Sequence, residues 1–250
     1  MPSPPPIFAQ FDLIRVVNLP ERADRRREMD AQFKAIGILG DPRIAYFPAI
    51  RADGPGPFLK VGSHGNFLAR IALFREAAAQ GASILILEDD CNFLVPEVFE
   101  ASLPPNWDIF YGGFEMVGDA APEDSSLIGS HCMAFSAEAA AAGADYLTRY
   151  LEPDFECDPI AVAEPGYNPA IRPPIDGAMV WMRRAYPQLV TCFERISVQR
   201  ASRSDVSGGK AIDRLPVVRD AVALARRVRN RLFGRRGMSK RNLTFGAPRD

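Results

Sequence analysis

One continuous hydrophobic run in the chain is followed at once by acidic residues. Residues 84–87 are four large apolar side chains in a row, and Glu88, Asp89 and Asp90 come directly after them. An uninterrupted apolar run of this length predicts a strand buried on both faces, as in the middle of a parallel sheet. Three carboxylates at the end of such a strand repel one another and are costly to desolvate. Core packing therefore does not explain them.

Strand-like and helix-like patterns alternate on both sides of this run. Apolar, β-branched stretches predict strands, and stretches with apolar residues every three or four positions predict helices. The predicted strands are 13–19, 43–48, 107–111, 130–135, 189–193 and 196–198, and the predicted helices are 20–36, 65–80, 136–151 and 175–184. The order strand, helix, strand, loop, helix, strand is typical of a right-handed α/β unit. We therefore expect an open, twisted, mostly parallel Rossmann-type sheet flanked by helices.

The flanking segments define the expected domain boundaries. Residues 1–11 are a proline-rich lead-in that we expect to be poorly ordered, and residues 12–209 hold the α/β domain. Within the domain, residues 152–175 contain six prolines and predict a long irregular segment, of the kind that forms a lid or an acceptor-side loop. Residues 210–250 form a separate tail.

The tail carries most of the positive charge of the chain. Residues 214–241 contain ten Lys or Arg against one acid, so this segment is +9 and the rest of the chain is −10. Apolar residues recur among the arginines at three- and four-residue steps, which predicts a basic amphipathic helix. Such a helix suits an anionic membrane face, the acidic body of the protein, or another partner. We expect a cytoplasmic protein, peripheral at the inner membrane face if the first alternative holds. The four cysteines form no CxxC pair, and no apolar run approaches a membrane span.

The acidic run has two interpretations. Ligands of open α/β sheets bind beyond the carboxyl ends of the strands, and a divalent cation there is held by one or two carboxylates, water and substrate phosphates. The alternative is a solvated turn whose acids cap a following helix. Four arginines between Arg22 and Arg27, just past the first strand, likewise suit either an anionic ligand or a solvated helix face.

Several segments together resemble glycosyltransferase family 25, the lipooligosaccharide and collagen-type galactosyl- and glucosyltransferases. The similar segments are 17–26 (the family's vNLxxRxDR opening), 85–90 (its acidic metal motif, a variant of DxD), 129–136 (the strand after the site), 174–176 (piD) and 204–206 (SDI). They occur in the family's order and span roughly residues 13–206. The resemblance implies a GT-A fold, a UDP-sugar as donor, and Mn²⁺ or Mg²⁺ as cofactor.

Sugar transfer needs a cation for the departing diphosphate and a base for the acceptor hydroxyl. We assign Asp90 as the metal ligand. Glu88 and Asp89 either belong to the coordination shell of the metal or bind the ribose of the donor. His131 is a further candidate for a metal ligand, because a single imidazole suits Mn²⁺. The alternative is that His131 is a core residue without a metal. For the base we choose Asp176, whose alternative role is a helix N-cap, and then Asp205.

The nucleotide contacts are expected at the mouth of the first strand. The candidates are Asn18, Arg22 and Arg25, with Asp53 as an additional contact from the following loop. The chain departs from the family at 69–70, where Ala-Arg stands in place of Ser-His. Arg70 would then meet an anionic acceptor or face solvent.

These features predict a metal-dependent hexosyltransferase that acts on a cell-surface glycan or lipooligosaccharide precursor, with no nucleic acid as partner. The leading alternative is a non-catalytic relative that binds a glycan or another partner. The change at Arg70 favours this alternative, whereas the intact acidic run argues against it. A nucleotidyltransferase ranks last, because residues 20–22 lack the glycine-rich loop that would hold phosphates.

Overall fold

The computed structural model describes residues 3–117, 121–123, 126–163 and 167–200. The chain divides into two units, 1–200 and 201–250, and all of the second unit lies outside the described residues. The predicted tail helix and Asp205 therefore stay predictions. Among the described residues, no helix combines the length and apolar character that crossing a membrane requires.

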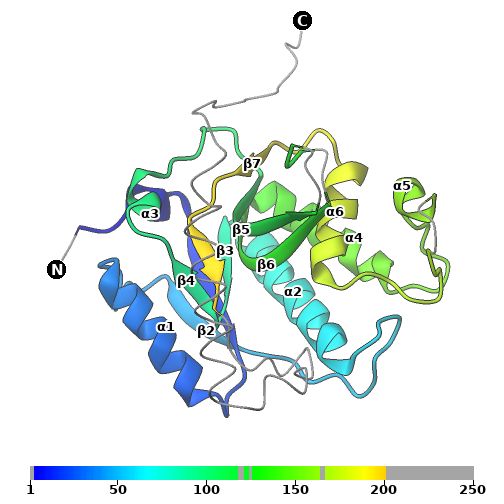
Figure 1. Ribbon diagram of the computed structural model, residues 1–250, viewed down its shortest axis with the longest axis horizontal. Helices are drawn as coiled ribbons and strands as arrows, with labels where there is room; N and C mark the ends of the chain where they lie inside the picture. The colour runs from blue at the N-terminus through cyan, green and yellow to red at the C-terminus, as the bar shows by residue number, and fades with distance from the viewer. Residues whose placement is uncertain (1–2, 118–120, 124–125, 164–166, 201–250) are drawn as a thin grey trace, which may run out of the picture. The chain divides into compact units, whose positions relative to one another are not determined.

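Helices and strands alternate along the described chain (Figure 1). The strands are β1 (Leu13–Asn18), β2 (Ile44–Pro48), β3 (Ile84–Glu88), β4 (Cys91–Phe93), β5 (Ile109–Val117), β6 (Ser126–Phe135), β7 (Thr191–Phe193) and β8 (Ser197–Gln199). The helices are η1 (Pro6–Gln10, a 3₁₀-helix), α1 (Ala23–Ala35), α2 (Val61–Gln80), α3 (Glu97–Glu100), α4 (Ala137–Tyr150), α5 (Pro159–Val162) and α6 (Ile175–Ala185).

Six strands form one sheet in the order β2-β1-β3-β6-β5-β7. β1 is parallel to β2 and β3, and β5 is parallel to β7, whereas β6 runs antiparallel to both of its neighbours. β4 and β8 pair separately as a two-stranded antiparallel sheet. The prediction of an open, mostly parallel α/β sheet flanked by helices is confirmed.

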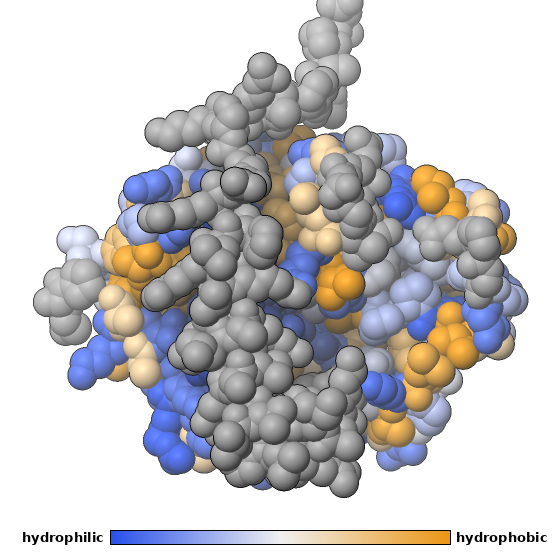
Figure 2. All heavy atoms as spheres, in the orientation of Figure 1, coloured by the Kyte–Doolittle hydropathy of each residue, from blue (hydrophilic) through white to orange (hydrophobic). Residues whose placement is uncertain are grey.

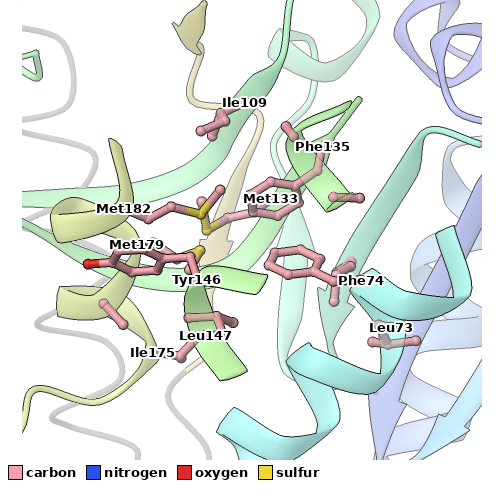
Figure 3. Close-up of a cluster of buried hydrophobic side chains, with 14 of the residues drawn as sticks. Leu73, Phe74, Ile109, Met133, Phe135, Tyr146, Leu147, Ile175, Met179 and Met182 are labelled. Atoms are coloured by element: carbon pink, nitrogen blue, oxygen red, sulfur yellow. The ribbon is translucent and has the colours of Figure 1, made fainter. Parts of the chain in front are cut away.

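The acidic strand lies in the middle of the large sheet and is buried on both faces, as predicted. All four aliphatic side chains of 84–87 have no exposed surface. Ile84 and Ile86 belong to the core under α2, α4 and α6, and Leu85 and Leu87 to the core under α1, α3 and η1. Figure 3 shows part of the first of these cores, where side chains of α2, α4, α6, β5 and β6 meet. Burying each side chain contributes about 1.5–3 kcal/mol to stability.

The lead-in differs from the expectation of poor order. Ile7, Phe8 and Phe11 are almost completely buried in the second core, and the Phe8 ring packs edge-on against Phe93 at a centroid distance of 5.6 Å. The prolines suggested a loose segment, but Pro6 lies within the first turn of η1, where its missing N–H costs nothing. Three large apolar side chains then cover a face that would otherwise be open to water.

The β5–β6 hairpin is longer than the sequence suggested. The predicted strand ends at residue 111, before the glycines at 112–113, whereas β5 continues past them through an irregular register with β6. A Cβ at Gly113 would collide with the side chains of His131 and Ser197. Glycine is therefore required there by the close approach of neighbouring side chains, and it does not end the strand.

Candidate active site

The parallel pairing of β1 and β3 brings the ends of both strands to one edge of the sheet, where Val17 is paired with Glu88. The reversed strand β6 brings its segment 129–130 to the same edge, because Leu87 is paired with Cys132. This edge therefore holds residues that are far apart in the sequence.

Asp89 is held in place by two buried partners. Asn18, the last residue of β1, donates from Nδ2 to Asp89 Oδ2 at 2.7 Å. Arg25, in the first turn of α1, donates from Nη1 to Asp89 Oδ1 at 2.5 Å, and both side chains of this ion pair are 9% exposed. A charge-assisted pair at this burial fixes the carboxylate in one orientation.

Asp90 is next to this pair but is less well compensated. Its Oδ2 lies 3.7 Å from Arg25 Nη1, and Gln199 Nε2 is 3.3 Å from the same oxygen. Burial raises the pKa of Asp90 to about 7, and repulsion by Glu88 adds to this effect. Near neutral pH the site therefore holds a carboxylate that is easily protonated and would be stabilised by an added positive charge.

The short sheet of β4 and β8 completes this edge. Cys91 of β4 is paired with Gln199, and the next residue, Arg200, donates from its backbone N to Asp90 O at 2.7 Å and from Nη2 to Asp89 O at 2.9 Å. Sequence reasoning missed both Gln199 and Arg200. Neither residue belongs to a motif, and only the pairing of β8 with the chain after the acidic strand brings them to the site.

Glu88, the last residue of β3, has different hydrogen-bond partners from the other two acids. Ser130 Oγ donates to Glu88 Oε1 at 3.1 Å, and Asn66 Nδ2 of α2 donates to the same oxygen at 3.3 Å. Neither partner was predicted. Ser130 lies inside a segment that resembles the family, which is the one signal that pointed to it.

Asp176 lies in the first turn of α6 but does not cap the helix. The N-cap is Pro174, which makes no side-chain capping bond. Asp176 Oδ2 instead accepts a hydrogen bond from the backbone N–H of Gly129 at 3.2 Å. Burial raises the pKa of Asp176, and the charge of Glu88 raises it further. The helix-cap alternative is therefore wrong, and the carboxyl is directed toward the sheet edge.

Arg70 is fully buried and does not face solvent. Its Nη2 donates to Ser130 O at 3.1 Å, while Nε and Nη1 have no hydrogen-bond partner among the described residues. Burial lowers the pKa of Arg70, and the charges of Glu88 and Asp176 oppose that shift. Arg70 therefore acts as the internal counter-charge of two candidate site carboxylates.

The remaining predicted residues are less closely tied to the acidic pair. His131 is buried, which lowers its pKa to about 4, and the charged groups that affect it are Asp176, Arg195 and Glu115. Arg22 pairs with Asp24 at 2.9 Å, and Asp53 is exposed on the loop between β2 and α2. The structure thus brings together Asn18, Arg25 and the three acids, and it does not join His131 or Asp53 to them.

Within the described ranges, no group of three or more His, Cys, Asp and Glu side chains is arranged to hold a metal ion. Any cation at this edge would therefore take part of its coordination from water or a ligand.

No protein-family model and no curated protein matches this sequence. Among solved structures, the chain is similar to a glycosyltransferase involved in the glycosylation of the major capsid of PBCV-1, with 12% identity, a TM-score of 0.41, and coverage of 76% of this chain and 94% of that one. It is also similar to mouse xyloside xylosyltransferase 1 in its apo form, with 13% identity, a TM-score of 0.42, and coverage of 74% and 84%. Likeness at this level does not establish an activity.

Proposed function

We propose that the chain is a glycosyltransferase that moves a hexose, galactose or glucose, from a UDP-sugar to a hydroxyl of a glycan or lipooligosaccharide precursor. The observation that carries the proposal is the buried pair Asp89 and Asp90 at the carboxyl end of β3. Asp89 is fixed by Asn18 and Arg25, whereas Asp90 has a pKa of about 7 and an incompletely balanced charge. Ligands of open α/β sheets bind at this edge, and the resemblance to glycosyltransferase family 25 supports a nucleotide-sugar donor.

A divalent cation fits the oxygen donors of Glu88 and Asp90. The repulsion that raises the pKa of Asp90 is the interaction that a bound cation would relieve. Mg²⁺ and Mn²⁺ are commonly held by one or two carboxylates together with water and substrate phosphates, so a site without three protein ligands is sufficient. When bound, the cation would neutralise the charge that develops on the departing diphosphate.

Asp176 is the proposed general base for the acceptor hydroxyl. A base works best when its pKa approaches the working pH, and burial together with Glu88 moves the pKa of Asp176 in that direction. Gly129 N–H holds Oδ2, and Arg70 limits the rise in pKa, so both groups favour the ionised, oriented carboxylate. Asp176 would take the hydroxyl proton as the acceptor oxygen attacks the sugar.

The test is a calorimetric titration of UDP with and without Mn²⁺, on the wild type and on Asp90→Asn. We expect binding that depends on Mn²⁺ in the wild type and is weakened at least tenfold in the variant. Glu138→Gln is the matched control, because it removes the charge of an exposed carboxylate at the start of α4. Absence of UDP binding at any Mn²⁺ or Mg²⁺ concentration would reject the proposal.

A non-catalytic binding module is the second candidate. It is favoured by the Ala-Arg at 69–70 in place of the Ser-His of glycosyltransferase family 25, which puts a buried arginine beside Ser130. If UDP binds with Mn²⁺ but no donor is consumed in the presence of glycan acceptors, this candidate replaces the first.

A further inference from the structure

Two cavities lie along one face of α6, apart from the acidic edge. The larger has a volume of about 460 Å³ and the smaller about 180 Å³. Both are lined by Trp181 and Arg184, which are three residues apart on the helix and so lie on the same face. The cavities are therefore neighbours that share a wall.

The lining of the smaller cavity includes the residue that follows the proposed base in the chain, although not Asp176 itself. The cavity is lined by Gly177, the residue after Asp176, and by Leu127, two residues before the Gly129 N–H that binds the Asp176 carboxylate. The larger cavity reaches Tyr186, just past the end of α6. At a rise of about 1.5 Å per residue, the path from Gly177 to Tyr186 is roughly 13 Å long, which is enough for more than one sugar ring.

Aromatic side chains form much of the wall of the larger cavity. Tyr146, Phe155, Trp181 and Tyr186 all line it, and Tyr146 meets Phe155 and Tyr186 edge-on at centroid distances of 5.5 and 6.0 Å. In Figure 2, the surface over the part of the molecule that holds α4, α5 and α6 in Figure 1 alternates between hydrophobic and hydrophilic patches. Flat aromatic faces of this kind pack against the C–H faces of sugar rings.

The charged groups of the larger cavity favour a neutral ligand. Three acids and two bases line it, namely Asp145, Glu156, Asp158, Arg149 and Arg184. Arg184 is already paired with Asp158 at 3.1 Å, so one arginine and two acids are left to meet a ligand. Vicinal hydroxyls of a sugar can donate hydrogen bonds to the carboxylates and accept hydrogen bonds from the guanidinium. The excess of acids disfavours the binding of an anion such as phosphate, sulfate or a sugar acid.

We infer that these two cavities form the acceptor track of the enzyme and hold a neutral oligosaccharide. Its reacting sugar would lie in the smaller cavity beside Asp176 and its distal sugar on the aromatic wall near Tyr186. The role as acceptor track rests on the proposed transferase function. Aromatic stacking and hydroxyl contacts, without a net positive charge, select a neutral glycan.

The experiment uses the full chain, with lactose and maltose as neutral probes and inorganic phosphate as an anionic probe. Saturation-transfer NMR and calorimetry measure the binding of each probe. We expect at least one disaccharide to bind in the millimolar range and phosphate not to compete with it. Tyr186→Ala should weaken disaccharide binding about tenfold, since it removes one stacking face. Tyr186→Phe keeps the ring and should bind nearly as well as the wild type.

Arg149→Ala provides a second variant in case Tyr186→Ala does not fold, because Arg149 is exposed at the cavity and its loss should also weaken binding. Arg27→Ala, an exposed arginine on α1, is its matched control and should bind like the wild type. Equal binding by the wild type and the folded cavity variants, binding of phosphate in place of the sugars, or no disaccharide binding up to tens of millimolar would overturn the inference.

Titration of UDP and Mn²⁺ on the same samples separates the two proposals. If UDP fails to bind but the disaccharide still depends on Tyr186, the transferase proposal fails and the cavity remains a glycan site. If UDP binds and the disaccharide result fails, the acceptor track alone is wrong.

Discussion

Asp90 should make the stability of this protein fall as the pH rises from about 4 to about 7. Its pKa is about 7 in the folded chain, against an ordinary value of 3.8. A carboxyl whose pKa is raised by folding binds its proton more tightly in the folded state. The free energy of unfolding therefore falls as the pH rises from about 4 to 7 and does not change further outside this range. Asp90→Asn removes this titration while keeping the shape of the side chain.

The magnitude follows from the pKa difference. Each pH unit inside the window is equivalent to about 1.4 kcal/mol, so between pH 5 and pH 8 the single carboxyl should cost about 2–3 kcal/mol. Other groups titrate in the same range, including Asp176, whose pKa is also raised. Their effects cancel to first order when the variant is compared with the wild type, since they occur in both.

Urea unfolding followed by circular dichroism at pH 5 and pH 8 measures this difference. We expect the free energy of unfolding of Asp90→Asn, minus that of the wild type, to be about 2–3 kcal/mol higher at pH 8 than at pH 5. Mn²⁺ at pH 8 should stabilise the wild type more than the variant, because only the wild type has the carboxylate. The same pH slope in both proteins would refute the argument that the charge of buried Asp90 is only partly compensated.

Two further predictions test the surroundings of the site and the lead-in. Arg25→Met should lower the free energy of unfolding by about 3–5 kcal/mol, because it leaves Asp89 buried without its cation, and by about 2 kcal/mol less when made in an Asp89→Asn background. Urea unfolding of the two single variants and the double variant measures this coupling, and simple additivity would contradict the ion-pair argument. Phe8→Ala should cost about 3–5 kcal/mol, since the ring has no exposed surface. Thermal unfolding measures that cost against Leu39→Ala, whose side chain is 48% exposed, and equal effects would mean that the lead-in is not part of the core.

The local features of the fold were largely predictable because they depend on neighbouring residues. The run of apolar side chains at 84–87 requires burial on both faces, and this placed the acidic strand in the middle of the sheet. The helix predicted over 136–151 begins at the expected place, because Ser136 is its N-cap and its Oγ accepts a hydrogen bond from the backbone N–H of Ala139 at 3.1 Å. The position of Asn18 and Arg25 near the acids followed from the order of strand and helix.

Longer-range features were not predictable in the same way. The sequence does not say that β6 is reversed, yet this reversal brings Gly129 and Ser130 to Asp176 and Glu88. It also does not say that β8 pairs with β4, which places Gln199 beside Asp90. These pairings are decided by packing between segments up to about a hundred residues apart, and no local pattern encodes them.

The sequence by itself determined the α/β architecture and the acidic strand end, because periodicity and residue type act over a few neighbouring positions. Only the tertiary structure decided which carboxylates are compensated and where Arg70 lies. An arginine on a helix is expected at the surface, but α2 packs against the sheet so that Arg70 is buried near Glu88 and Asp176. The sequence determines which side chains can carry a charge. The free energy of holding that charge depends on the water and the counter-charges that surround it in the folded chain.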